Sequence, residues 1–279
     1  GKGVIVAETL QQAEEAVTDM LSGNAFGDAG CRVVIEEFLE GEEASFNVMV
    51  DGTHVLPMAT SQDHKRIGEG DTGPNTGGMV AYSPAPVVDE AVFQRIMDQV
   101  ITPTVAGMAA EGNPYTGFLY AGLMIDKQGQ PHVIEYNCRF GDPETQPIMM
   151  RLQSDLVALC EQAIDGALDR ASASWDPRSA MGVVLAAGGY PGSYAKGSTI
   201  HGRDTPQPET VKVFHAGTSL DDDRVVTSGG RVLCVTALGE DIGAAQQACY
   251  QAVEKIDWEG MTLRRDIGWR AIARYSQAD

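Results

Sequence analysis

The sequence lacks a long apolar run and a leader-like beginning. None of its 279 residues lie in a stretch that approaches the roughly 18 consecutive apolar residues of a membrane-spanning helix. The first residues, Gly-Lys-Gly-Val, have neither the charged nor the apolar region of a signal peptide. We therefore expect a cytoplasmic protein that does not act in a membrane.

Paired cysteines and basic residues are also scarce. The five cysteines form an odd, scattered set without a Cys-x-x-Cys pair, which argues against a disulfide framework and against a zinc site. Lys and Arg total 20 against 39 Asp and Glu, so the formal net charge is -19. This charge repels nucleic-acid backbones, and we expect no DNA or RNA partner.

Familiar catalytic signatures are missing as well. The sequence contains no Walker A motif and no His-Glu-x-x-His, and spacing identifies no Ser-His-Asp triad. Residues 68–73 (Gly-Glu-Gly-Asp-Thr-Gly) match the dinucleotide fingerprint literally. That fingerprint needs a helix directly after it, whereas Pro74 and two further glycines follow here, so we reject the match.

What is present indicates an α+β protein of two or three compact domains, with 43% hydrophobic residues available for buried cores. Residues 61–86 are rich in Gly, Pro and small polar residues and predict a long loop, either functional or disordered. Pro103 predicts a break in its helix. Apolar periodicity predicts strands at 2–7, 33–39, 44–50, 54–60, 116–126, 132–137, 180–187, 211–216 and 231–238, and helices at about 9–23, 87–111, 147–168 and 244–255.

The most informative run is residues 133–144, Val-Ile-Glu-Tyr-Asn-Cys-Arg-Phe-Gly-Asp-Pro-Glu. On a strand, Val133, Glu135, Asn137 and Arg139 face the same way. A carboxylate and an amide oxygen suit Mg²⁺, whose shell phosphates and water commonly complete, and a guanidinium can grip a phosphate oxygen. The alternative interpretation is an edge strand with a solvated polar face.

Two further segments could meet phosphate or nucleotide. Lys2 lies between two glycines, so its ammonium and the backbone amides could approach a phosphate together, although a solvent-exposed lysine would look the same. The strand expected at 33–39 ends among five carboxylates, which normally indicates a solvated edge.

Taken in order, these features resemble the ATP-grasp superfamily, in which a glycine-rich loop covers the phosphates and a Glu-x-Asn strand holds the metal. The resemblance is most specific to the glycinamide ribonucleotide synthetase family, also called phosphoribosylamine-glycine ligases. It rests on six blocks: Asp63 to Arg66, Gly73 to Met79, Tyr82 to Pro86, Tyr120 to Gly122, Glu135 to Glu144, and Arg264 to Ala271.

The resemblance implies an enzyme of purine biosynthesis that uses ATP and Mg²⁺, with Mn²⁺ as a possible substitute. Such a ligase joins glycine to 5-phosphoribosylamine through a glycyl phosphate and releases ADP and phosphate. The implied metal ligands are Glu135 and Asn137, and the implied catalytic residues are Arg139, beside the transferring phosphate, and Asp63, for the glycine ammonium. The implied nucleotide-binding residues are Lys2, Glu36, Glu37, Phe38, Leu39 and Glu43, and the implied substrate residues are Asn75, Thr76, Gly77, Gly78 and Asp142.

The resemblance further implies an ATP-grasp fold with a partial amino-terminal lobe at 1–60, a larger antiparallel-sheet lobe at 61–172 and a small α+β domain at 175–279. Two departures from the family pattern stand out. Val80 replaces a glycine, which would strain the backbone if that position needs a positive φ. The family's amino-terminal domain is missing, so we expect a fragment that needs this segment for a complete site.

Two alternatives remain at this stage. The chain could be an ATP-grasp ligase for another carboxylate, or a non-catalytic fragment that binds nucleotide.

Overall fold

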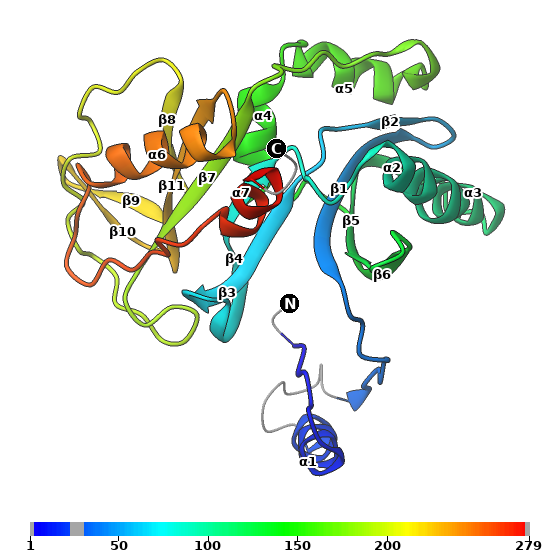
Figure 1. Cartoon of the computed structure of the whole chain (residues 1–279), viewed down its shortest axis with the longest axis horizontal. Helices are drawn as coiled ribbons and strands as arrows, with labels where there is room; N and C mark the ends of the chain where they lie inside the picture. The colour runs from blue at the N-terminus through cyan, green and yellow to red at the C-terminus, as the bar shows by residue number, and fades with distance from the viewer. Residues whose placement is uncertain (1–2, 23–30, 277–279) are drawn as a thin grey trace. The chain divides into compact units, whose positions relative to one another are not determined.

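The computed structural model describes residues 3–22 and 31–276. The chain divides into two compact units, Gly1–Glu40 and Gly41–Asp279. Figure 1 shows the path of the chain through each of them.

The smaller unit is built around one helix, α1 (Leu10–Leu21). This helix was predicted, and a capping box begins it: the amide of Gln12 donates to Thr9 Oγ1 at 3.2 Å, and Gln12 Oε1 accepts from the amide of Glu8 at 2.8 Å. The strands expected at 2–7 and 33–39 are wrong for the residues described. These segments run without a ladder partner, and Val34 and Ile35 remain 84% and 79% exposed.

The larger unit contains a four-stranded antiparallel sheet in the order β2-β1-β5-β6. The strands predicted at 44–50, 116–126 and 132–137 are confirmed. Asp51 and Gly52 lie in the turn of the first hairpin, and the turn at 126–130 joins the strands of the second. One face of this sheet packs on a helical layer (Figure 1), in which Pro103 lies in the first turn of the last helix and a π-helical turn precedes it. The strands are β1 (Glu42–Asp51), β2 (Val55–Pro57), β5 (Thr116–Ile125) and β6 (Pro131–Asn137), and the helical layer is α2 (Glu90–Ile96), the π-helical turn (Met97–Ile101) and α3 (Thr102–Ala110).

A five-stranded antiparallel sheet, in the order β3-β4-β7-β11-β8, forms the rest of the unit. Its core includes the fully buried side chains of Met181, Val183 and Leu233, and α6 packs on this core. The strands are β3 (Gln62–Gly68), β4 (Thr72–Ser83), β7 (Ser179–Ala186), β8 (Val211–His215) and β11 (Arg231–Gly239), and the helix is α6 (Ile242–Val253).

Residues 61–86 are therefore not a long loop. They form the β3–β4 hairpin, whose irregular register absorbs the glycines that hide its strand character in the sequence. Gly70 and Asp71 turn the hairpin with φ of 66° and 55°, and no helix follows them. Val80 is fully buried and pairs with His64 and Val183, and it is not among the residues with positive φ, so the expected strain is absent.

The sheet also crosses an expected domain boundary, because β4 pairs with β7 along Val80 to Ser83. Strands from 61–172 and from 175–279 thus share one sheet and one core. The division into three domains stays a prediction.

The single helix expected at 147–168 is two helices. The chain leaves the first at Leu152, which bridges to Trp175, and Asp155 caps the second by accepting from the amides of Val157 and Ala158. The remaining elements are α4 (Thr145–Arg151), α5 (Leu156–Ile164), a 3₁₀ turn (Leu168–Arg170), β9 (Thr218–Asp221), β10 (Arg224–Thr227) and α7 (Trp269–Ser276). Within the described ranges, no helix has the length and apolar character to cross a membrane.

Candidate functional site

The candidate site lies on the face of the four-stranded sheet opposite the α2–α3 layer. Cross-strand pairing places Ser45 beside Gly122 and Glu135, and Asn47 beside Tyr120 and Asn137. Their neighbours Phe46 and Ala121 belong to the core under the helices, so these polar side chains point the other way. We call Ser45, Asn47, Tyr120, Glu135 and Asn137 the polar face.

A bulge decides which residues of β6 join the polar face. Gly122 pairs with Glu135, but Leu123 pairs with Val133, so Ile134 is the extra residue. Val133 therefore shares a face with Leu123, on the helical side, and not with Glu135. The expected row of four side chains is wrong in this one member, while Glu135 and Asn137 keep their common face.

The predicted metal ligands lie together. The side-chain amide of Asn137 donates a hydrogen bond to Glu135 Oε1 at 3.3 Å. Glu135 Oε2 and Asn137 Oδ1 can then act as oxygen ligands for a metal ion. Arg139 follows them, donating to the carbonyl of Phe140 at 2.8 Å and lying 3.5 Å from Asn137 Oδ1. Among the residues described, no three His, Cys, Asp or Glu side chains gather as a metal cage. Two oxygen ligands without a cage fit Mg²⁺ that phosphates and water also coordinate.

Two buried carboxyl groups adjoin the polar face. Backbone hydrogen bonds between Ser45 and Ser61 bring the start of β3, and with it Asp63, next to β1. Glu144 is buried and Asp63 is half-buried, and the buried Oδ1 of Asp63 has no hydrogen-bond partner among the residues described. Burial and the charge of Glu144 raise the pKa of Asp63 well above its ordinary value, and burial raises the pKa of Glu144.

Hydroxyl groups connect Glu144 to the polar face. Ser45 Oγ donates to Glu144 Oε1 at 2.7 Å, which leaves the Tyr120 hydroxyl, 3.1 Å from Ser45 Oγ, to donate to Ser45. Burial, then the Glu144 charge, raise the pKa of Tyr120, so it stays a donor. Tyr120 and Ser45 thus supply Glu144 with a hydrogen bond, whereas none is available to Asp63 Oδ1.

Lys65 is the cation that most lowers the pKa of both carboxyl groups. Its ammonium lies 2.8 Å from Glu43 Oε2, the residue expected at the ribose. Burial lowers the pKa of Lys65, but Glu43, Asp63 and Glu135 outweigh this and leave it raised. Lys65 is therefore charged and serves several carboxylates at once.

The predicted substrate residues of β4 are fixed by hydrogen bonds. Thr76 Oγ1 donates to the carbonyl of Lys65 at 2.7 Å and accepts from the amide of Gly78 at 3.0 Å. Gly78, with φ of 113°, packs so closely that an added Cβ would lie 2.3 Å from Pro143 Cδ and 2.8 Å from Asp63 Oδ1. We call residues 75–78 the acceptor segment. Asn75 is part of it, on the strand and partly exposed.

Asp142, also predicted at the substrate, is paired within the chain. Arg231 Nη2 donates to Asp142 Oδ2 at 2.8 Å. Asp142 remains 56% exposed and can still reach solvent.

The predicted adenine-binding residues belong to the smaller unit. Glu36, Glu37 and Phe38 are exposed, and Leu39 is half-buried, on an extended segment. Their role stays a prediction. Lys2 lies outside the described residues.

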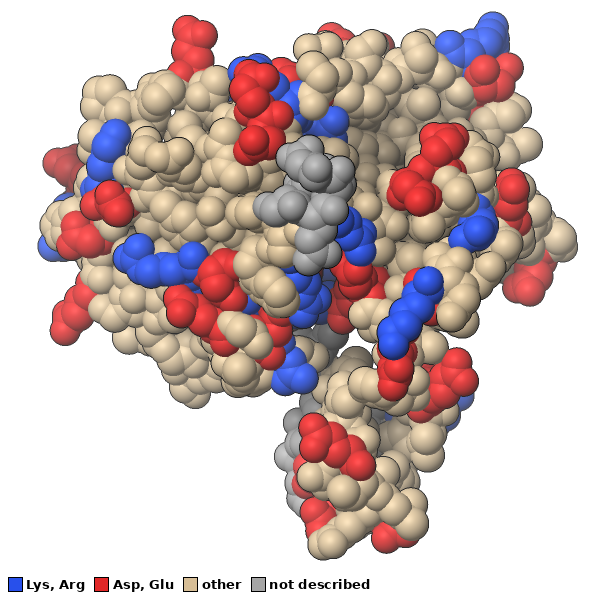
Figure 2. Space-filling model, viewed as in Figure 1, with Lys and Arg blue, Asp and Glu red and all other residues tan. Residues whose placement is uncertain are grey.

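Two other charged regions contrast with this site. The side chains of Asp71, Asp266, Arg264 and Arg270, which we call the arginine cluster, pair with one another at 2.5 to 2.8 Å. Figure 2 shows acidic side chains in scattered groups on the visible surface, with fewer Lys and Arg between them.

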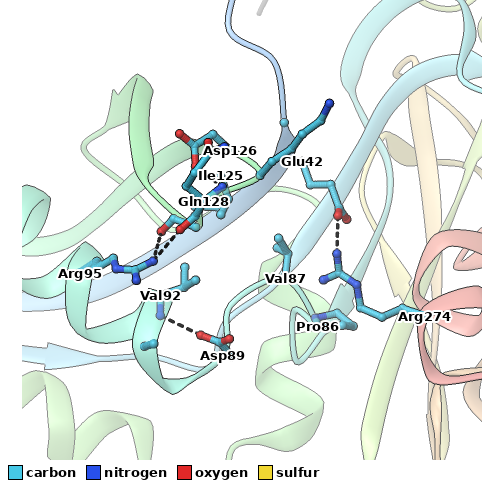
Figure 3. A pocket seen from close by; sticks show the side chains of 14 residues that line it. Glu42, Pro86, Val87, Asp89, Val92, Arg95, Ile125, Asp126, Gln128 and Arg274 are labelled. Atoms are coloured by element: carbon cyan, nitrogen blue, oxygen red, sulfur yellow. Dashed lines mark hydrogen bonds and ion pairs between the residues drawn. The ribbon is translucent and has the colours of Figure 1, made fainter. Parts of the chain in front are cut away.

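A pocket of about 720 Å³ lies beside α2 and the β5–β6 turn (Figure 3). Its charged groups largely satisfy one another or the backbone: Arg274 pairs with Glu42, Arg95 donates to the carbonyls of Gln128 and Gly129, and Asp89 caps α2. None of the sequence-predicted site residues that the structure describes lines it. It is therefore a poor candidate for the reaction.

Comparison with known proteins agrees with the class that the fold defines. A biotin carboxylase from Campylobacter jejuni, in a structure described as a complex with a β,γ-ATP, aligns with a TM-score of 0.68 at 19% identity, over 94% of this chain and 56% of that one. At this identity the likeness concerns the fold alone, which is the ATP-grasp fold.

Two family models cover most of the chain. The phosphoribosylglycinamide synthetase ATP-grasp (A) domain matches residues 1–145, and the C domain of the same synthetase matches residues 180–270. The chain belongs to the phosphoribosylglycinamide synthetase family.

Relatives at high identity carry the name phosphoribosylamine-glycine ligase. Those of Vibrio cholerae and Salmonella typhimurium are 71% and 70% identical over 98% of this chain. The chain spans 64% of the length of each. The solved structure of the Thermotoga maritima ligase aligns with a TM-score of 0.84 at 35% identity, over 95% of this chain and 66% of that one.

Sequence reasoning missed several residues of the site. Lys65 and Glu144 lie inside the motif blocks, but their partners become visible only when β1, β3 and α4 meet. Ser45 follows Ala44 on a strand and carries no signal of its own. Arg231 follows two glycines far along the chain, and only the fold brings it to Gly77.

Proposed function

We propose that this chain carries the ATP-dependent ligase activity of its family, joining glycine to 5-phosphoribosylamine through a glycyl phosphate, in the cytoplasm. ATP and Mg²⁺ would be required, and Mn²⁺ would substitute. The observation that carries the proposal is the polar face, where Glu135 and Asn137 offer oxygen ligands beside the under-neutralised carboxyl groups of Asp63 and Glu144.

The proposal assigns a task to each charged group. Glu135 and Asn137 would hold Mg²⁺, which when bound would neutralise charge on the phosphates. Arg139 would contact the transferred phosphate, because its guanidinium is exposed beside Asn137. Glu43 would bind the ribose, and the extended segment of Glu36, Glu37, Phe38 and Leu39 would bind adenine, with Lys2 at the phosphates.

Asp63 would bind the ammonium of glycine. A cation at its unpartnered, buried Oδ1 would supply the hydrogen bond and the positive charge that this carboxyl group lacks. The acceptor segment and Asp142 would line the site of the amine, which attacks the acyl carbon, displaces phosphate and loses a proton.

An assay of ADP and amide formation tests the proposal. It uses the 279-residue chain and a chimera that supplies the part of the Vibrio cholerae ligase that this chain does not match. We expect the chimera to form product only when glycine and phosphoribosylamine are both present, and the 279-residue chain alone to form little. A panel of other carboxylates should give no product.

Glu135→Ala should lower the rate by about a thousandfold or more, because half of the protein's metal donors are lost. The matched control is Glu161→Ala, on the exposed surface of α5. Full activity of Glu135→Ala would remove the metal assignment, and equal activity with another carboxylate would replace glycine as the substrate.

A further inference from the structure

Arg231, at the start of β11, joins two segments of the candidate site. Its Nη1 donates to the carbonyl of Gly77 at 2.7 Å and to that of Asp142 at 3.0 Å, and lies 3.3 Å from the carbonyl of Gly78. Its Nη2 donates to Asp142 Oδ2 at 2.8 Å. One guanidinium thus contacts both the acceptor segment and the turn that follows the metal-binding strand.

The packing around this guanidinium leaves little freedom. An added Cβ at Gly77 would lie 3.0 Å from Arg231 Cζ, so the arginine rests directly against the backbone of β4. The side chain of Arg231 is only 21% exposed. A planar fork that satisfies a carboxylate and backbone carbonyls at once fixes direction as well as distance, which an ammonium cannot do.

Tyr190 completes the contact from the same region of the chain. Its hydroxyl accepts from the amide of Gly77 at 2.9 Å, so both backbone polar groups of Gly77 are bound by side chains from residues 190–231. Tyr190 in turn packs on Gly230, where an added Cβ would lie 2.3 Å from its ring. Residues matched by the family's C domain therefore determine where the acceptor segment lies.

We propose that Arg231 is a positioning residue for the amine substrate, and that with Tyr190 it braces the acceptor segment against the turn at Asp142. This rests on the proposed function, since the acceptor segment and Asp142 are assigned there to the amine. The metal ligands precede the turn and are not contacted by Arg231. The brace therefore affects transfer to the amine more than the activation of glycine.

Kinetics of the active chimera separate these steps. Arg231→Gln should raise the KM for phosphoribosylamine by about tenfold or more while the KM values for glycine and ATP stay within about twofold. It should also raise the amount of ADP formed per amide product. Arg231→Lys should recover part of the loss, because a lysine keeps the charge but not the fork.

The matched control is Arg224→Gln, since the side chain of Arg224 is 60% exposed and, within the described part of the chain, forms an ion pair only with nearby Asp221. It should leave all three KM values unchanged. A fall of kcat in Arg231→Gln with unchanged KM values and unchanged ADP per product would overturn the positioning role.

Hydrogen exchange on the 279-residue chain tests the brace without any activity. The amide of Gly77 should exchange at least about tenfold faster in Tyr190→Phe and in Arg231→Gln than in the unchanged chain or in Arg224→Gln. Unchanged exchange would overturn the brace itself. A chimera that forms no amide product would instead overturn the proposed function, and the assignment of the brace to the amine would fall with it.

Discussion

The arginine cluster and the Asp63–Glu144 pair are both groups of partly or fully buried carboxylates in the same unit, but their charges are treated in opposite ways. In the cluster, hydrogen bonds from His64 and Arg264 hold the pKa of Asp71 below its ordinary value. Arg264 likewise lowers the pKa of Asp266 against the effect of burial. For Asp63 and Glu144 burial prevails, and both pKa values are raised.

The arginine cluster has balanced charges that join segments of the fold, whereas the Asp63–Glu144 pair has negative charge without enough positive partners. The arginine cluster ties the tip of the β3–β4 hairpin to residues 264–270, since Arg264 also donates to the carbonyl of Arg66 and the amide of Gly70 donates to Asp266. Its charges are matched within the chain. The Asp63–Glu144 pair has excess negative charge, which a cationic substrate could neutralise. Asp63 and His64 are neighbours on one strand, but Asp63 belongs to the pair with raised pKa values and His64 contacts Asp71 of the arginine cluster.

Removing the cation of the arginine cluster should give the largest effect on stability. Arg264 has a fully buried side chain paired with Asp71 and Asp266. Arg264→Met should lower the free energy of unfolding by about 3–5 kcal/mol, because the half-buried carboxylates of Asp71 and Asp266 lose their buried partner. Urea unfolding measures this, with exposed Arg224→Met as the control expected within about 1 kcal/mol of the unchanged chain. A loss equal to the control would show that the cluster is not balanced by Arg264.

Neutralising Asp63 should stabilise the protein, whereas Arg264→Met destabilises it. Asp63→Asn should raise the free energy of unfolding by about 1 kcal/mol at neutral pH, since it removes charge repulsion with Glu144. It should also raise the KM for glycine in the active chimera. Destabilisation comparable to Arg264→Met would mean that Asp63 is held by interactions as strong as those of the cluster.

The two groups should also differ in their pH dependence. A carboxyl group whose pKa is raised by folding binds more protons in the folded state, so it favours folding at low pH. For Asp63 and Glu144 this contribution to stability is complete below their ordinary pKa values of 3.8 and 4.5. It is lost as the pH rises through their raised pKa values. Asp71 and Asp266 instead contribute to stability above pH 3.8, their ordinary pKa. This contribution is lost as the pH falls through their lowered pKa values.

Urea midpoints between about pH 3 and pH 8 test this difference. In Asp63→Asn, the urea midpoint should decline less steeply as the pH rises above about 4. Arg264→Met should leave this decline unchanged. The same slope in Asp63→Asn and in the unchanged chain would assign the decline to other groups.

The smallest effect belongs to an exposed pair. Arg274 and Glu42 are 43% and 34% exposed and pair across the pocket of Figure 3. Arg274→Ala should change the free energy of unfolding by less than about 1 kcal/mol, and 1 M salt should remove most of the difference. A larger change in urea unfolding would place this pair with the buried ones.

The sequence predicted most regular elements and the class of site, for identifiable reasons. Alternation marked β1, β5 and β6, and Glu135 and Asn137 are two residues apart on one strand, so local geometry suffices to bring them together. The β3–β4 hairpin was missed because its glycines and its irregular register conceal the alternation on which strand prediction depends. The bulge at Ile134 leaves no local signature, so the side taken by Val133 could not be predicted.

Contacts between distant segments account for the other omissions. Ser45 and Glu144 are a hydrogen-bonded pair separated by 99 residues, and Arg231 meets Gly77 across 154. Such pairs depend on the tertiary arrangement, which propensity and spacing do not encode.

The pairing of β4 with β7 bears on how the protein is made. Val80 and Val183 are about a hundred residues apart, so the central ladder of the five-stranded sheet closes a long loop and is expected to form slowly. During synthesis the β3–β4 hairpin emerges early and carries an open edge until β7 arrives. That edge is a point of vulnerability to wrong association in the nascent chain. Expression of residues 175–279 alone would expose the complementary edge of β7.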